Sequence, residues 1–167
     1  MKKIVIYESV TGFTKKYAQW IAEELQAEIK DTRTMNGVNL AEYDLVVFGG
    51  WLMGGRISGL EKIHKQNVKK LVVFATGASL DTKELAEEIR KANPLSGISF
   101  FYLPGGMHYS ELGFMKKAML KMVKKSIAKK ENKTEADLYM EKVICTDFDM
   151  TDKEYIVPLI EACEERE

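Results

Sequence analysis

The sequence predicts an α/β fold in which one open, doubly wound parallel sheet has helices on both faces. Short runs of β-branched and aromatic residues alternate along the chain with segments whose apolar residues recur every three or four positions. Uninterrupted apolar runs are typical of parallel strands buried on both faces, and this alternation favours right-handed crossovers. The chain has 167 residues, 46% of them hydrophobic and only 3 of them proline, which excludes a disordered or collagen-like chain.

Five strands are expected from these runs, four strong and one, at about 27–33, weaker. The strong strands cover 4–7, 45–48, 71–74 and 98–103. Helical spacing is found at 18–25, 60–63 and 85–89, and a last helical segment begins near Thr151.

The regular alternation stops after the fifth strand. About 45 residues separate that strand from the last helical segment, where a short loop would suffice. Part of this excess has helical spacing, and no repeat or low-complexity linker interrupts the chain. We therefore expect a single domain over 1–167, with a helical insertion at about 105–150. Its periodic apolar residues are Leu112, Met115, Met119, Met122, Val123 and Ile127.

Three hydroxyl residues and a glycine follow the first strand, in the segment SVTGFT at 9–14. Glycine permits close backbone approach and a helix N-terminus offers free N–H groups, so the segment predicts a phosphate site at the ligand-binding edge of the sheet. It lacks both the Gly-Lys-Ser/Thr of a P-loop and the three glycines of a dinucleotide fingerprint, which favours a mononucleotide. The alternative is that Ser9, Thr11 and Thr14 only cap the following helix.

The same segment resembles the phosphate loop of the flavodoxin-like family, which has the pattern Ser/Thr-x-Thr-Gly-x-Thr after its first strand. The resemblance spans most of the chain and looks greatest to the flavodoxin-domain branch that includes the protoporphyrinogen dehydrogenases. Residues 48–50 (FGG), 101–109 (FYLPGGMHY) and the Met- and Lys-rich segment 112–122 carry this second likeness. The resemblance implies a flavodoxin-like sheet of order 2-1-3-4-5 and an FMN cofactor held by the loops after strands one, three and four.

Three loops of this chain match those cofactor loops. The first would hold the phosphate, the segment GGWLMGG at 49–55 would border the flavin ring, and the loop from Thr76 would close its other edge. Trp51 either stacks on the ring or packs the end of the sheet. The cofactor-binding residues implied by the resemblance are Ser9, Thr11, Gly12, Phe13, Thr14, Gly50, Trp51, Leu52, Met53, Thr76, Gly77 and Ala78.

The third loop, TGAS at 76–79, departs from typical flavodoxins because it has no aromatic residue to shield the outer flavin face. We expect that face to be open to a substrate or covered by the insertion, through Met107, His108 or Tyr109. His108 is a candidate for contact with flavin or substrate because it follows the carboxyl end of a strand.

The charge is balanced overall, with 25 basic and 25 acidic residues, but it is unevenly placed. Eight lysines and one glutamate lie within 112–133, a local charge of +7 that leaves about −7 on the rest. A Met-rich stripe with lysines opposite is typical of an amphipathic surface helix, so we expect 112–130 to contact a membrane surface or an acidic protein. The alternative is that the stripe packs against its own domain. The overall balance argues against nucleic acid as a partner.

The remaining candidates suggest no further chemistry. Cys145 and Cys163 form neither a CxxC motif nor a disulfide framework, and without a leader or a spanning segment we expect a cytoplasmic protein, peripheral at the inner membrane face if the insertion binds lipid. His64 is expected at the surface, and no metal is expected. The acidic residues around Asp149 and Asp152 lack the glycine and terminal glutamate of a calcium loop, so helix capping explains them better.

We therefore expect an FMN-binding redox protein that transfers electrons to or from a partner protein or a small-molecule substrate. Two alternatives stay open: an oxidoreductase that resembles protoporphyrinogen dehydrogenase and uses a quinone acceptor, and a binding module that has the fold without the cofactor. The sequence identifies no catalytic residue and no oligomeric state.

Overall fold

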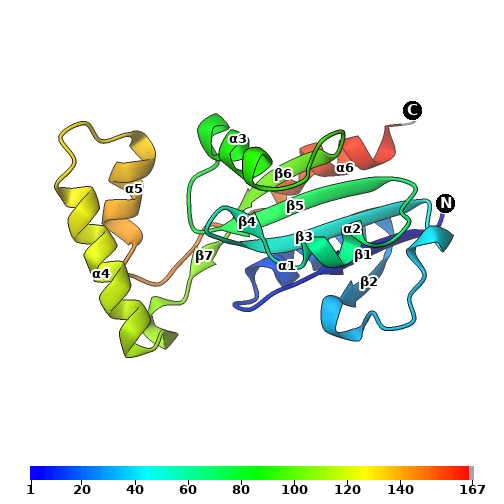
Figure 1. The fold of residues 1–167 in the computed structure, drawn as a ribbon, viewed down its shortest axis with the longest axis horizontal. Helices are drawn as coiled ribbons and strands as arrows, with labels where there is room; N and C mark the ends of the chain where they lie inside the picture. Colours follow the sequence, from blue (N-terminus) through cyan, green and yellow to red (C-terminus); the bar gives the residue numbers. More distant parts are fainter. Residues whose placement is uncertain (166–167) are drawn as a thin grey trace.

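The computed structural model of this chain, which describes residues 1–165, is built around five parallel strands in the order β2-β1-β3-β5-β6 (Figure 1). Taken in chain order, these five strands have the arrangement 2-1-3-4-5, which confirms the predicted fold class. The strands are β1 (Lys3–Tyr7), β2 (Glu28–Asp31), β3 (Leu45–Met53), β5 (Leu71–Gly77) and β6 (Ser99–Pro104).

Helices cover both faces of this sheet. On one face α1 (Phe13–Leu25) and α6 (Val157–Glu164) bury Tyr17, Ile21 and Leu159 against the strands. On the other face α2 (Leu60–His64) and α3 (Lys83–Ala92) bury Ile63 and Ile89. Short 3-10 turns complete the connections, at Thr32–Thr34, Leu40–Glu42, Tyr109–Glu111 and Lys153–Ile156.

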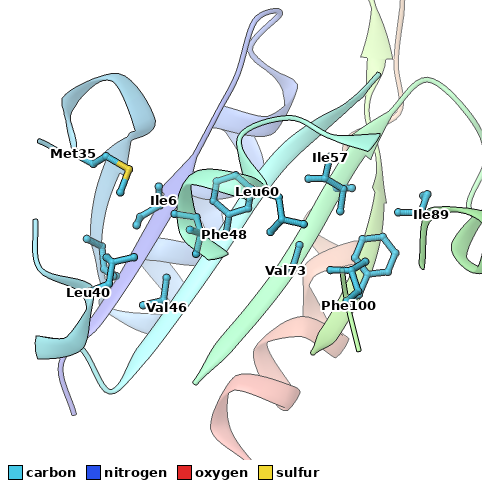
Figure 2. Packing of buried hydrophobic residues seen from close by; sticks show 14 of the residues in the cluster. Ile6, Met35, Leu40, Val46, Phe48, Ile57, Leu60, Val73, Ile89 and Phe100 are labelled. Carbon is cyan, nitrogen blue, oxygen red and sulfur yellow. The ribbon is translucent and has the colours of Figure 1, made fainter. Parts of the chain in front are cut away.

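The core is divided by the sheet into two apolar clusters. Successive residues of β3 alternate between them, with Val46 and Phe48 on the α2 and α3 side and Val47 on the α1 and α6 side. Figure 2 shows the first cluster, in which Phe48 and Val73 lie between the sheet and the helices that cover it. A strand buried on both faces requires apolar side chains at consecutive positions, which is why the strands were recognisable as uninterrupted runs.

The third strand is longer than predicted and continues into a hairpin. We expected a strand at 45–48 followed by a loop, but β3 extends to Met53 and pairs with β4 (Arg56–Ile57). The turn between them is Gly54-Gly55, with φ of +58° and +79°, values that suit the type I′ turn of a two-residue hairpin. The predicted ring-border residues at 50–53 therefore lie on a strand.

Gly49 and Gly50 are part of that strand because the neighbouring elements approach it closely. A Cβ atom on Gly49 would overlap the ring of Phe74, and one on Gly50 would overlap the backbone oxygen of Ser58. The double glycine thus permits packing within the sheet, where a loop had been expected.

The helical insertion after the last parallel strand is present and is more structured than predicted. It consists of β7 (Gly106–Met107), α4 (Phe114–Ala128), α5 (Glu135–Val143) and β8 (Phe148–Asp149). The two short strands pair antiparallel and close its base, and the two helices stand beyond the carboxyl ends of the parallel strands (Figure 1). Within the described residues, no helix combines the length and apolar character that crossing a membrane requires.

Two helix boundaries in this region depend on capping. Thr134 and Asp137 form a capping box that starts α5, a helix the apolar spacing did not reveal. The last helix begins at Val157, later than predicted, because Asp152 accepts a hydrogen bond from the Glu154 amide and starts a 3-10 turn first. The expected capping role of this acidic segment is thereby confirmed at Asp152.

The close approach at Gly49 can be tested by adding a single methyl group. Gly49→Ala should lower the free energy of unfolding by about 2 kcal/mol, because the methyl group must displace the buried Phe74 ring. Urea unfolding followed by circular dichroism measures the change. Gly113→Ala is the control for a methyl group without a clash, because a Cβ there meets no atom within 4 Å and the backbone φ is −66°; the loss of glycine at the N-cap of α4 should cost less, about 0.5–1 kcal/mol. Equal effects of the two substitutions would contradict the packing explanation.

Candidate functional site

The segment 9–14 connects β1 to α1 beside the point where the strand order reverses, the usual ligand site of an open α/β sheet. Gly12 is the N-cap residue of α1, with φ of +96°, and no side chain caps this helix. The Ser9 hydroxyl accepts a hydrogen bond from the Gly12 amide at 3.1 Å, and Thr11 is exposed. The interpretation of these hydroxyls as helix caps is therefore wrong.

Two helices of the chain, α3 and α5, have the side-chain cap that α1 lacks, whereas α2, α4 and α6 are also without one. The Thr82 hydroxyl accepts from the Leu85 amide at the start of α3, and Thr134 caps α5 in the same way. The first amides of a helix have no partner within the helix. At α1 they are thus left for a ligand, and the positive end of the helix dipole favours an anion there.

Thr14 ties this segment to the neighbouring strand. Its side chain is buried, and its hydroxyl oxygen lies 2.7 Å from the hydroxyl oxygen of Thr76, which is also buried at the end of β5. Thr14 and Thr76 thus belong to the framework of the site, while Ser9, Thr11 and Gly12 form its accessible part.

The third loop is held by a residue that the sequence analysis missed. The Tyr102 hydroxyl donates to the Ser79 carbonyl oxygen at 2.8 Å and accepts from the Ser79 amide at 3.1 Å. Burial raises the pKa of Tyr102, so the hydroxyl keeps the proton that it donates. A Cβ on Gly77 would meet this hydroxyl at 2.9 Å, so Gly77 lets the loop pass close to the tyrosine. Tyr102 thus holds the third loop close to the end of the sheet.

Trp51 lies next to this framework. It pairs with Thr76 in the register of β3 and β5, so both side chains are on the face of the sheet that α1 covers. The indole Nε1 is buried and is the only buried side-chain nitrogen or oxygen of the described residues without a hydrogen-bond partner. A buried donor without an acceptor costs about 1–3 kcal/mol, which a ligand acceptor would recover.

The hairpin that carries Leu52 and Met53 is fastened by Asn93, a second residue that sequence reasoning missed. The Asn93 amide group donates to the Gly55 carbonyl oxygen at 2.8 Å and accepts from the Ile57 amide at 2.9 Å. Asn93 follows the last residue of α3, so the helix on one face of the sheet positions the turn at its carboxyl edge. The only local signal is an Asn-Pro pair, which is typical of any turn.

Glu8 connects three segments at the same edge. Its carboxylate accepts hydrogen bonds from the Thr32 hydroxyl at 2.9 Å, from the Lys62 ammonium at 2.6 Å and from the Ser58 hydroxyl. Partial burial alone would raise the pKa of Glu8, but these bonds to Lys62, Ser58 and Thr32 outweigh it and hold the pKa below its usual value. The ion pair thus joins the end of β1 to the start of α2.

The insertion reaches the site through His108, whose ring stacks on Phe13 with centroids 4.8 Å apart. The Gly105 amide donates to the Gly77 carbonyl oxygen at 2.8 Å, which fixes the base of the insertion beside the third loop. Tyr109 instead packs within the insertion, where the Lys117 ammonium lies over its ring, 5.5 Å from the ring centroid. Of the aromatic candidates in the insertion, His108 is thus the one packed against the first loop.

Arg56 and His64 lie on the other side of the hairpin. They line an open cavity of about 480 Å³ together with Glu8 and Asn93, on the face covered by α2 and α3. Trp51 and Thr76 are on the opposite face, so the structure does not bring Arg56 and His64 to the first loop.

A family model described as Flavodoxin domain matches residues 4–135. The flavodoxin-like domain-containing protein BilS of Clostridioides difficile is 39% identical over 87 residues, which cover 47% of this chain and 49% of that protein. An uncharacterised protein of Methanocaldococcus jannaschii is 32% identical over 101 residues, 54% of this chain and 67% of that protein. The chain thus spans about half the length of the first of these relatives.

Solved structures of flavoproteins are also similar. A flavoprotein from Lactobacillus acidophilus in complex with FMN has a TM-score of 0.45 and 17% identity, with coverage of 62% of this chain and 91% of that one. Oxidised flavodoxin 2 from Bacillus cereus has a TM-score of 0.43 and 22% identity, with coverage of 62% and 84%.

The Glu8 network should make stability depend on pH. A carboxyl group whose folded pKa is depressed stabilises the fold above its ordinary pKa, near 4.5, and that contribution is lost as the pH falls through the folded pKa. Glu8→Gln should therefore lower the free energy of unfolding by about 1 kcal/mol at neutral pH, and the difference from the native chain should shrink below about pH 4.

Thermal unfolding at a series of pH values measures this difference. Glu87→Gln is the matched control, because Glu87 is exposed on α3 and has no recorded ion pair among the described residues. A Glu8→Gln penalty that stays constant from neutral to acidic pH would contradict the role assigned to the carboxylate.

Proposed function

This chain belongs to the flavodoxin domain family, and on that premise we propose that it binds FMN at the carboxyl edge of its sheet and transfers electrons with it. The observation that carries the proposal is the uncapped N-terminus of α1, which follows a glycine in the left-handed region and lies among three hydroxyl residues. Such a site favours the phosphate of a mononucleotide.

The accessible part of the first loop would hold the phosphate. The backbone amides at the start of α1 would donate to the phosphate oxygens together with the hydroxyls of Ser9 and Thr11, and Gly12 lets the backbone come close. Thr14 would not contact the phosphate directly; its hydrogen bond to Thr76 would hold the loop in position. Phe13 and His108 would form an aromatic wall beside the loop.

The remaining predicted residues would border the flavin ring. Gly50, Trp51, Leu52 and Met53 lie on the end of β3, and Thr76, Gly77 and Ala78 lie on the end of β5 and the loop that Tyr102 holds. When bound, FMN would supply the redox chemistry, accepting and passing on electrons. The hydrogen bonds of Asn93 to the hairpin and of Tyr102 to the third loop would hold these two borders in place.

A second candidate function is the oxidation of a porphyrinogen with a quinone as acceptor. The observation that favours it is the third loop, which has no aromatic residue over 76–81 and would leave one ring face accessible to a flat substrate. Each step would remove two electrons and two protons from the porphyrinogen and convert one quinone to its quinol. An anaerobic assay of the FMN-loaded protein separates the candidates: turnover supports the enzyme, and reduction of a protein acceptor without turnover supports an electron carrier.

The phosphate assignment predicts the effect of removing single hydroxyls. Ser9→Ala and Thr11→Ala should each weaken FMN binding about tenfold, because each loses one hydrogen bond to a charged group. Titration of the flavin-free protein with FMN, followed by flavin fluorescence, measures the dissociation constant. Ser126→Ala, an exposed hydroxyl deletion on α4, is the matched control. A protein that acquires no flavin absorbance when FMN is added would refute the proposal.

The unpartnered indole of Trp51 gives an independent prediction. Trp51→Phe keeps an aromatic ring and removes the N–H, so without FMN the variant should be as stable as the native chain or slightly more stable. If the N–H donates to the cofactor, FMN binding should weaken about tenfold. Thermal unfolding without FMN and fluorescence titration with it measure the two effects. Unchanged affinity would show that the N–H does not contact the cofactor.

A further inference from the structure

The helix α4 has two apolar stripes, and only one of them is covered. Residues follow one another by about 100° around a helix, so Leu120 and Ile127 lie on one side, where Ile127 is buried. Met115, Met119 and Met122 lie on a different side and expose 84%, 59% and 71% of their surface. The predicted single stripe that included Ile127 is therefore two stripes.

The covered stripe packs against α5, which forms a helical hairpin with α4. The methionine stripe points away from this contact, and Phe114 at the start of the helix is 87% exposed. Figure 1 shows the hairpin standing beyond the end of the sheet, away from the helices that cover the two faces. The alternative that the methionines pack against their own domain is therefore wrong.

Lysines border the methionine stripe. By helical position Lys121 and Lys125 follow one edge and Lys116 the other, and α4 contains no acidic residue. The ion pairs of the hairpin involve Lys130 with Asp137 and Lys133 with Glu141, each at 2.6 Å, near the turn between the helices. Among the described residues, the lysines of α4 itself form no recorded salt bridge. The face thus combines exposed apolar side chains with uncompensated positive charge.

We propose that α4 lies flat on an anionic lipid bilayer, with the three methionines among the upper acyl chains and Lys116, Lys121 and Lys125 at the lipid phosphates. This proposal goes beyond the FMN site and does not depend on it. Exposed apolar side chains bordered by lysine are the pattern of an interfacial helix, and long lysine side chains can reach the headgroups from beside an inserted stripe.

The composition of the face favours a bilayer over an acidic protein. Protein interfaces are enriched in arginine and depleted in lysine, and their ion pairs rely on the fixed geometry of the guanidinium group. Every cation of α4 is a lysine, and the hairpin contains no arginine. Phosphate headgroups move laterally, so binding them requires positive charge but no fixed geometry. Lysine supplies that charge.

Sedimentation with vesicles tests the proposal, with protein in both FMN-loaded and flavin-free form. The chain should pellet with vesicles of equal parts phosphatidylcholine and phosphatidylglycerol, should stay in solution with phosphatidylcholine alone, and should be released by high salt. Binding by both forms would show that this surface acts independently of the cofactor site. If neither form bound vesicles, the FMN proposal would be unaffected.

Two variants locate the contact. Lys121→Glu combined with Lys125→Glu should weaken binding about 30-fold or more, since each lysine near anionic lipid contributes about fivefold. Gln at positions 115, 119 and 122 together keeps the charge and should weaken binding about tenfold by removing apolar contact. Lys83→Glu combined with Lys91→Glu makes the same charge change on exposed positions of α3 and should have little effect.

All of the substituted side chains are exposed, so each variant should fold. Circular dichroism checks that it does. Binding that is lost in the α4 variants and kept in the α3 control supports the proposal. Three results would overturn it: no sedimentation with anionic vesicles, equal binding to neutral vesicles, or equal loss in the α3 control. A dimer in analytical ultracentrifugation that the methionine substitutions abolish would also overturn it, because a second copy would then cover the face.

Discussion

The buried hydrogen bond between the hydroxyls of Thr14 and Thr76 joins the first turn of α1 to the end of β5, across the edge where the candidate ligand loops meet. Both side chains are nearly inaccessible to solvent, so each hydroxyl needs the other as its partner. Their bond fixes how close the uncapped start of α1 lies to the central strands. The position of Trp51 follows from the same contact, since its strand pairs with β5 at Thr76.

The rest of the edge is held by contacts between segments that are distant in the chain. Glu8 joins three of them through one carboxylate, Tyr102 holds the third loop, and Asn93 fastens the glycine turn. A cofactor site needs its contacting groups positioned by rigid elements, and these three residues supply that support from helices and strands. The accessible residues Ser9, Thr11 and Gly12 thus lie beside a framework that these contacts hold together.

The neutral total charge conceals a separation that matters for partners. The segment 112–133, which contains α4, carries +7 and the remainder of the chain about −7. Lys130 and Lys133 pair with Asp137 and Glu141 of α5, but among the described residues the lysines of α4 itself form no salt bridge. A zero net charge therefore does not exclude an anionic partner for one part of the surface.

Local sequence patterns determined the parallel sheet, the helices that cover it and the glycine-containing first loop, because periodicity and a glycine among hydroxyl residues reflect short-range physical requirements. Tertiary structure decided whether Ser9 and Thr11 cap α1 or leave it open, and whether Gly49 and Gly50 form a loop or part of a strand. It also decided which stripe of α4 is covered. The pairing of Thr14 with Thr76 and the bonds of Asn93 join residues tens of positions apart. Spacing along one chain cannot report which distant groups satisfy a buried donor or cover an apolar face, since that depends on how the elements pack.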